Sequence, residues 1–350
     1  MLYGVEFYMV DDKLNYIKNP SNIPLEKAKY VVLDLETTGL SARYDRIIEF
    51  GAVRVEKGMV VENLALLINP ERKLPEKIVE ITNITDAMLR YQPTIKEAMP
   101  QILEFLQDAI IVTHNAEFDF SFLQEELANL GLPLLTNPVI DTLSLSQFLY
   151  PEDRNHRLGT LCRKFEVVYD EDSAHRADYD AQVLNDCWMP MLVKLMREQN
   201  IVTHEDLGKL PNSNTLLKHM RANHCIALAK NKAGLKDLYK LVSLSHVDFL
   251  ADVPKLPKSE LVKLRENLIV GSACFNSDVF RTARYYNEER LKQVVSFYDY
   301  IEIQPIENYS YMINMGDATE EEILKYVKDI VKVAGLTTTK GVGKIQVNTK

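Results

Sequence analysis

The segment from Tyr30 to Glu36 constrains the fold of this chain most. Its apolar run at residues 30–33, rich in β-branched side chains, predicts a buried central strand. Side chains alternate along a strand, so the following Asp34 and Glu36 project from the same face. Two adjacent carboxylates repel each other unless a cation lies between them. Because oxygen ligands without a nearby cysteine suit hard cations, the segment predicts a Mg²⁺ or Mn²⁺ site.

Two later segments supply the groups that such a site still needs. Asp119 lies at the start of an amphipathic pattern that predicts a helix over 117–130. Asp180 lies in a second helical pattern over 177–197, and His175 stands five residues before it. An imidazole held in a loop ahead of that helix is suited to act as a general base near neutral pH. Together, the four carboxylates and the histidine predict a two-metal site for phosphodiester hydrolysis.

The segment that carries these residues has the pattern of an α/β domain. Two of its expected strands form a hairpin that turns at Lys57-Gly58. An antiparallel unit followed by strands that alternate with helices predicts a mixed sheet with helices on both faces. The expected strands cover 30–36, 47–55, 59–68, 109–113 and 138–141, and the expected helices lie near 95–107, 117–130, 157–165 and 177–197.

Three motifs in this segment resemble those of the DEDD 3′–5′ exonucleases. They read DLETTG, HNAEFD and HRADYDA, and they occur in the order that the family has. The resemblance is to the histidine-bearing branch, because Arg176 occupies the position where the other branch carries a tyrosine. It implies a ribonuclease-H-like fold, two bound Mg²⁺ or Mn²⁺ ions and hydrolysis at DNA 3′ ends.

The same resemblance implies roles for individual residues. Four acidic residues would be metal ligands, one histidine would be the general base, and four further residues would contact the 3′-terminal nucleotide. The ligands are Asp34, Glu36, Asp119 and Asp180, the base is His175, and the nucleotide contacts are Thr37, Leu40, Asn115 and Phe118.

The segments on either side resemble the PHP domain of the PolC-type DNA polymerase III alpha subunit. They read YGVEFYMVDD before the nuclease, and HCIALAKNKAGLKDLYKLVSLSH with LIVGSACFNSDVF after it. In that family the exonuclease is inserted into the PHP domain, which is the order of segments here. We therefore expect PHP-like segments at 1–28 and 221–335, the exonuclease at 29–200, a linker at 201–220 and a divergent tail at 336–350.

PHP domains hold a metal cluster, and three positions of this chain match its ligands: Glu6, His224 and Cys274. The opening HxH segment and the closing DxH segment of the family have no counterpart here. Three ligands from separated segments do not make a secure multinuclear site. We therefore expect a partial PHP-like α/β domain, in which these residues are a strand carboxylate, a core histidine and a buried thiol.

Composition favours a soluble protein of the cytoplasm. Among its 350 residues no run approaches 18 consecutive apolar side chains, and the N-terminus lacks a basic region ahead of an apolar core. These features predict neither a membrane span nor a secretory signal. The four cysteines have no CxxC spacing and suggest reduced thiols rather than a disulfide framework.

Three functions are compatible with these features. The first is a metal-dependent 3′–5′ exonuclease that removes mispaired nucleotides during DNA replication. The second is trimming of RNA 3′ ends by the same chemistry, because no motif residue identifies a group that senses the 2′-hydroxyl. The third is a non-catalytic scaffold that binds the replicative polymerase or the sliding clamp. The complete set of four acidic residues with His175 argues against a purely structural role.

Overall fold

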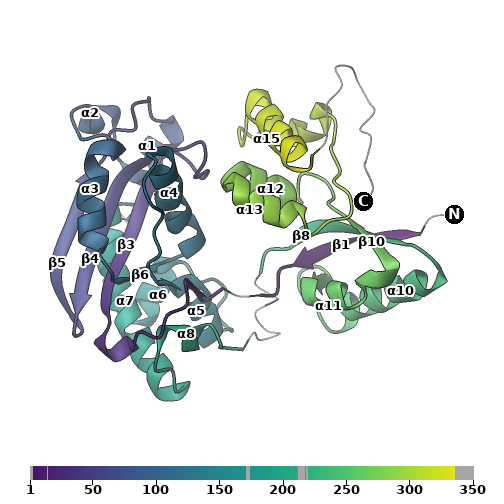
Figure 1. Ribbon diagram of the computed structural model, residues 1–350, viewed down its shortest axis with the longest axis horizontal. Helices are drawn as coiled ribbons and strands as arrows, with labels where there is room; N and C mark the ends of the chain where they lie inside the picture. The colour runs from purple at the N-terminus through teal and green to yellow at the C-terminus, as the bar shows by residue number, and fades with distance from the viewer. Residues whose placement is uncertain (1–2, 14, 171–173, 212–216, 218–219, 336–350) are drawn as a thin grey trace. The chain divides into compact units, whose positions relative to one another are not determined.

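The chain folds into two compact units (Figure 1). One consists of Leu14–Asn212, and the other combines Met1–Lys13 with Ser213–Lys350. The computed structural model describes residues 3–13, 15–170, 174–211, 217 and 220–335. Among these residues, no helix combines the length and the apolar character needed to cross a membrane.

The unit Leu14–Asn212 is built on a six-stranded mixed sheet with the order β2-β7-β6-β3-β4-β5. The central strand β3 runs antiparallel to β4 and parallel to β6. Strand β5 completes a hairpin with β4, while β7 continues the parallel side and pairs with the short β2. The strands are β2 (Ile17–Lys18), β3 (Lys29–Thr37), β4 (Ile47–Glu56), β5 (Met59–Leu67), β6 (Ile110–Thr113) and β7 (Val139–Asp141).

Helices cover both faces of this sheet, as Figure 1 shows. Val31 and Leu33 of β3 pack with α3 and α4 on one face, whereas Tyr30 and Val32 pack with α5, α6 and α7 on the other. This burial on both faces explains the continuous apolar run. The helices are α1 (Glu76–Thr82), α2 (Asp86–Leu89), α3 (Ile95–Leu106), α4 (Ala116–Asn129), α5 (Thr142–Leu149), α6 (Leu158–Lys164), α7 (Ala177–Glu198) and α8 (His204–Leu207), with the 3₁₀ turn η1 (Leu25–Lys27).

The mixed α/β architecture expected from the sequence is confirmed. Each expected strand and helix is present with ends shifted by a residue or two. The β4–β5 hairpin turns at Lys57 and Gly58, whose φ angles of 52° and 77° lie in the left-handed region that such tight turns require. Four helices of this unit were not expected from the sequence: α1, α2, α5 and α8.

The boundaries of this unit differ from those expected at 28/29 and 200/201. Strand β2 pairs with β7, and the backbone N–H of Leu25 donates to the carbonyl of Val202 at 2.9 Å. The side chain of Leu25 is 1% exposed and belongs to the core under β3. Residues 15–28 and 201–211 therefore belong to this unit and not to a flanking segment or a linker.

The other unit contains a four-stranded sheet with the order β10-β8-β1-β9. Strand β1 pairs antiparallel with β8, from Gly4 opposite Leu228 to Met9 opposite Asn223. The two segments that flank the unit Leu14–Asn212 thus share one sheet, although their identity as a PHP-like domain stays a prediction. The expected tail at 336–350 lies outside the described residues.

The strands of this unit are β1 (Gly4–Val10), β8 (Asn223–Ala229), β9 (Lys255–Pro257) and β10 (Leu268–Gly271). Its helices follow the sheet strands and continue to the end of the described chain. They are α10 (Lys232–Val247), α11 (Lys258–Lys263), α12 (Asp278–Tyr285), α13 (Glu288–Val295), α14 (Ser310–Asn314) and α15 (Glu320–Val333), with 3₁₀ turns η2 (Arg265–Asn267) and η3 (Ile306–Tyr309).

Candidate active site

The carboxyl end of β3 supplies the first two acidic side chains of the site. Asp34 and Glu36 are both half-buried, and their even spacing puts them on the sheet face that α7 covers. Asp34 lies opposite Gly51 on β4, and Glu36 lies opposite Glu49. The register shifts directly after Glu36, so the end of the strand bends at the site.

Asp119 reaches the same strand from the first turn of α4. The helix begins after Asn115, whose left-handed backbone (φ 78°) turns the chain out of β6. The carboxylate of Asp119 is 2% exposed and accepts a hydrogen bond from the hydroxyl of Thr113 at 2.5 Å. It also accepts from the backbone N–H of Leu35, which lies between the two acidic residues of β3.

Asp180 and His175 come from the start of α7. Ligand atoms of Glu36, His175 and Asp180 all lie within 4.8 Å of one another. The backbone N–H of His175 donates to Oδ2 of Asp180 at 2.9 Å, while the imidazole-bearing residue itself is exposed. Asp178, which helical spacing turns away from Asp180, is exposed as expected. The hydroxyl of Tyr169 approaches the other oxygen of Asp180 at 3.4 Å.

Burial raises the pKa of every carboxyl in the group, and neighbouring negative charges add to the shift. Desolvation, followed by the charges of Asp180 and Glu49, raises the pKa of Glu36 to about 9. Desolvation raises the pKa of Asp119 to about 7, although the bond from Thr113 opposes this shift. For Asp34, desolvation and the charge of Asp119 hold the pKa well above its usual range. Without a cation, ionising all four carboxyls therefore carries a large electrostatic free-energy cost.

The donor set fits a pair of hard divalent ions. All four acidic groups offer carboxylate oxygens, and no cysteine thiol stands among them. Mg²⁺ and Mn²⁺ prefer such oxygen ligands, and their positive charge offsets the repulsion that raises these pKa values. Residues Asp34, Glu36, Asp119 and Asp180 are therefore suited to hold the ions.

The four residues expected to contact substrate adjoin these ligands in sequence. Leu40 is 61% exposed, and Asn115 is also exposed. Phe118 is half-buried. Thr37 is buried, and its hydroxyl donates to the carbonyl of Gly39 at 2.5 Å. Contact of these residues with a nucleotide stays a prediction.

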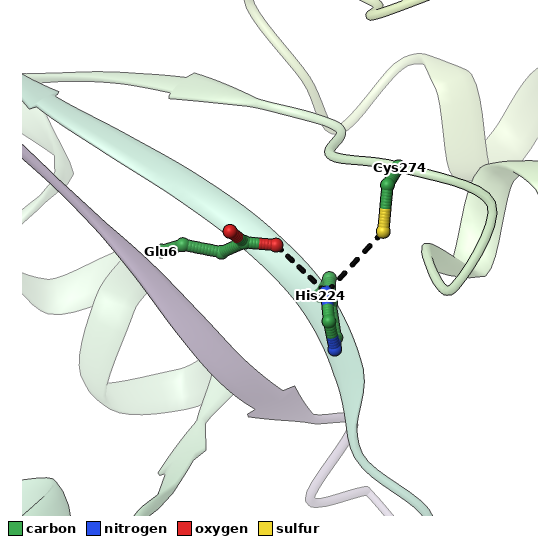
Figure 2. A group of neighbouring side chains, drawn as sticks. All are labelled: Glu6, His224 and Cys274. Carbon is green, nitrogen blue, oxygen red and sulfur yellow. Dashed lines mark hydrogen bonds and ion pairs between the residues drawn. The ribbon is translucent and has the colours of Figure 1, made fainter. Parts of the chain in front are cut away.

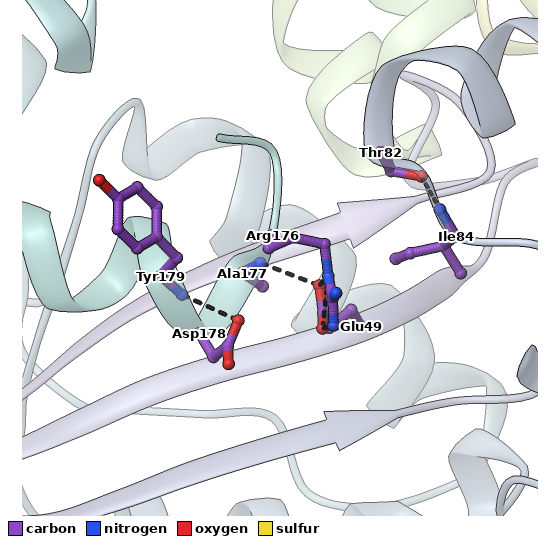
Figure 3. A network of polar contacts seen from close by, with 7 residues as sticks. All are labelled: Glu49, Thr82, Ile84, Arg176, Ala177, Asp178 and Tyr179. Atoms are coloured by element: carbon purple, nitrogen blue, oxygen red, sulfur yellow. Dashed lines mark hydrogen bonds and ion pairs between the residues drawn. The ribbon is translucent and has the colours of Figure 1, made fainter. Parts of the chain in front are cut away.

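Sequence reasoning missed five residues that support the site. Thr113 and Tyr169 bind the carboxylates of Asp119 and Asp180. Figure 3 shows that Arg176 and the backbone of Ala177 both reach the carboxylate of Glu49. Arg176 lies between two site residues in the third motif. A charged side chain at that place was the sequence signal that could have identified it as a supporting residue.

A second group of metal-ligating side chains lies in the other unit. Glu6 pairs with Ile226 on β8, two positions from His224, so both side chains lie on one face of the sheet. Nδ1 of His224 is 2.7 Å from Oε1 of Glu6 and 3.3 Å from Sγ of Cys274, as Figure 2 shows. Glu6 is exposed, and the other two residues are half-buried. The expectation of a core histidine and a buried thiol is therefore not met.

Residues 31–186 match the family model described as Exonuclease. This segment is similar in sequence to that family. The match includes all five residues of the proposed site, which are Asp34, Glu36, Asp119, His175 and Asp180.

Over nearly its whole length the chain is similar to DNA polymerase III PolC-type from two bacilli. It is 41% identical over 334 residues to the protein of Halalkalibacterium halodurans. The aligned stretch covers 95% of this chain and 23% of that protein. It is 41% identical over 328 residues to the protein of Bacillus subtilis, which spans 93% of this chain and 23% of that protein. The chain thus spans about a quarter of the length of these relatives.

A solved structure with a similar chain trace is Exonuclease X in complex with 5′ overhanging duplex DNA. It is 24% identical, covers 51% of this chain and 99% of its own, and has a TM-score of 0.41.

Proposed function

We propose that this chain is the 3′–5′ exonuclease part of a PolC-type DNA polymerase III, and that it removes mispaired nucleotides from DNA 3′ ends during replication. The observation that carries this proposal is the meeting of Glu36, His175 and Asp180 within 4.8 Å beside two further acidic residues. The exonuclease match and the PolC-type relatives support the choice of reaction and substrate.

The proposed mechanism assigns each group of the site one task. Asp34, Glu36, Asp119 and Asp180 hold two divalent ions, which when bound supply activation of water and stabilisation of the leaving oxygen. The exposed imidazole of His175 accepts the proton of the attacking water. Thr113 and Tyr169 keep the ligand carboxylates oriented through their hydroxyls.

An unpaired 3′ end is the substrate that this site fits best. Leu40 presents an apolar side chain, 61% exposed, close in sequence to the ligands of β3. An aliphatic side chain there can pack against the terminal base once that base has left its partner. Mismatched ends fray more readily than paired ones, so selectivity for errors comes partly from the substrate itself.

Nuclease assays test this proposal against its alternatives. The chain should release nucleotides from single-stranded and mismatched-end DNA in Mg²⁺, and chelation should stop the release. A faster reaction on RNA of the same sequence would favour RNA 3′-end trimming. No hydrolysis of either substrate, with retained binding of polymerase or sliding clamp, would favour the scaffold function.

We also propose that Glu6, His224 and Cys274 bind one metal ion separately from the nuclease site. A carboxylate, an imidazole and a thiol within 4.8 Å of one another form a ligand set that suits Zn²⁺ with a fourth position open. Desolvation raises the pKa of the Cys274 thiol, so a metal would have to displace its proton on binding.

Substitution with Co²⁺ tests this second site. Bound Co²⁺ gives thiolate charge-transfer absorbance, which Cys274→Ser should remove while Cys225→Ser, at a buried thiol on β8, should not. Absence of that absorbance in the unaltered protein would contradict the proposal.

A further inference from the structure

The buried carboxylate of Glu49 binds both residues that follow His175. Glu49 on β4 is only 1% exposed. Its Oε1 accepts from Nη2 of Arg176 at 2.6 Å, and Nε of Arg176 lies 3.2 Å from each carboxylate oxygen. Its Oε2 also accepts from the backbone N–H of Ala177 at 2.9 Å. Figure 3 shows both contacts meeting at this side chain.

These contacts connect the sheet to the start of the third motif. Glu49 lies opposite Glu36 on the β3–β4 ladder, so the residue that binds Arg176 and Ala177 is adjacent to a proposed metal ligand. Arg176 and Ala177 stand between His175 and Asp180 in sequence. Their attachment to Glu49 therefore fixes the short segment from which the proposed base projects.

Backbone packing at Gly51 holds the same place from a second direction. A Cβ atom at Gly51 would lie 2.0 Å from the carbonyl carbon of Ala177, so β4 and the start of α7 touch backbone to backbone. His175 itself has φ 61°, a left-handed conformation that a residue with a Cβ adopts only when its surroundings hold it. Glu49 holds the two residues that follow His175, and Asp180 holds the backbone N–H of His175 itself.

We propose that Glu49 and Arg176 are positioning residues, whose ion pair holds the imidazole of His175 in place to accept the proton of the attacking water. This inference rests on the proposed nuclease function. Neither residue touches the substrate in this assignment, and both act through His175. The bidentate guanidinium–carboxylate geometry suits the task, because two parallel bonds fix orientation as well as distance.

Loss of stability alone does not separate positioning from a structural role, since breaking any buried ion pair destabilises a fold. A double-mutant cycle with His175 does separate them. Arg176→Ala should lower kcat on single-stranded DNA by about 10–100-fold while KM changes by less than about 3-fold. In a His175→Ala background the same change should cost less than about 3-fold, because no base remains to be positioned.

Conservative variants and a matched pair complete the test. Glu49→Gln keeps an acceptor for the N–H of Ala177 and should retain more activity than Glu49→Ala. The kcat of Arg176→Lys should lie between that of the unaltered protein and that of Arg176→Ala. Arg54→Ala removes the control pair on the same strand, where Nη1 of Arg54 is 2.9 Å from Glu62. It should lower the melting temperature and leave kcat unchanged.

Two outcomes overturn the inference by itself: an equal loss from Arg176→Ala with and without His175, or an equal loss of kcat from Arg54→Ala. A His175→Ala protein with unaltered rate would instead refute the assignment of the base in the proposed function, and the inference would fall with it. If Arg176→Ala does not fold, the same cycle is run with Arg176→Lys.

Discussion

The backbone N–H of His175 donates to Oδ2 of Asp180 at 2.9 Å. The proposed base and a proposed metal ligand are thus joined by a contact that does not use the imidazole. The ring remains exposed and available for a proton. Because every residue except proline would retain the N–H at position 175, the chemistry of the base can be altered without removing this contact.

His175→Ala should therefore lower the rate of hydrolysis by roughly 10²–10⁴-fold, the usual contribution of a general base. Binding of Mg²⁺ should change little, since the backbone bond to Asp180 persists. Single-turnover rates over a range of Mg²⁺ concentrations and pH measure both effects. An unchanged rate with an unchanged acid limb of the pH profile would mean that another group activates water.

Asp34→Ala and Asp119→Ala should each abolish hydrolysis without unfolding the protein. Each change removes a ligand from a shared ion site, so the double variant should be hardly slower than either single variant. Asp178→Ala is the control, because this exposed neighbour of Asp180 points away from the site. Losses that multiply in the double variant would argue against a common metal site.

The metal-free protein should become less stable as pH rises from about 4 to about 9. The folded-state pKa is raised from 4.5 to about 9 for Glu36 and from 3.8 to about 7 for Asp119. The folded state therefore binds more protons than the unfolded state in this window, and the free energy of unfolding falls with rising pH. Thermal unfolding in chelator measures the trend.

Saturating Mg²⁺ provides the control for that measurement, because bound cations favour the ionised carboxylates and should reverse or flatten the slope. A metal-free stability that rises over the same pH range would contradict the assigned repulsion.

A chain cut to residues 29–200 should be markedly less stable than one cut to 14–212. The shorter chain loses the buried side chains of Tyr16, Leu25 and Leu207, which are at most 2% exposed. Full burial of a large apolar side chain contributes about 1.5–3 kcal/mol, so the deficit should be several such increments. Urea denaturation of the two chains compares them, and equal midpoints would contradict the boundaries that the structure gives.

Much of the nuclease sheet could be predicted because its strands carry strong local signals. The run at residues 30–33 and the Lys57-Gly58 turn each specify their own conformation. The proposed ligand residues could be located for a similar reason, since each lies near a recognisable strand or helix start, and their role as ligands stays a prediction. Residues 15–28 could not, because Leu25 gains its position from Val202, which is distant in sequence.

The supporting residues of the site were hidden for the same reason. Glu49 looks like an ordinary alternating strand residue, and nothing local reveals that Arg176 will neutralise it. Likewise, the meeting of Glu6 with His224 depends on the register between two strands separated by the whole nuclease. Local pattern specifies what each segment forms, whereas long-range pairing decides which side chains meet.

The pairing of β1 with β8 also sets an order of events during synthesis. About 210 residues separate the end of β1 at Val10 from the start of β8 at Asn223. At about 5–20 residues per second, a ribosome needs roughly 10–40 s to deliver the partner strand. The intervening unit has time to fold first, while the early strand waits with open backbone donors and acceptors. Nascent chains of this protein should therefore need protection of β1 until translation has passed β8.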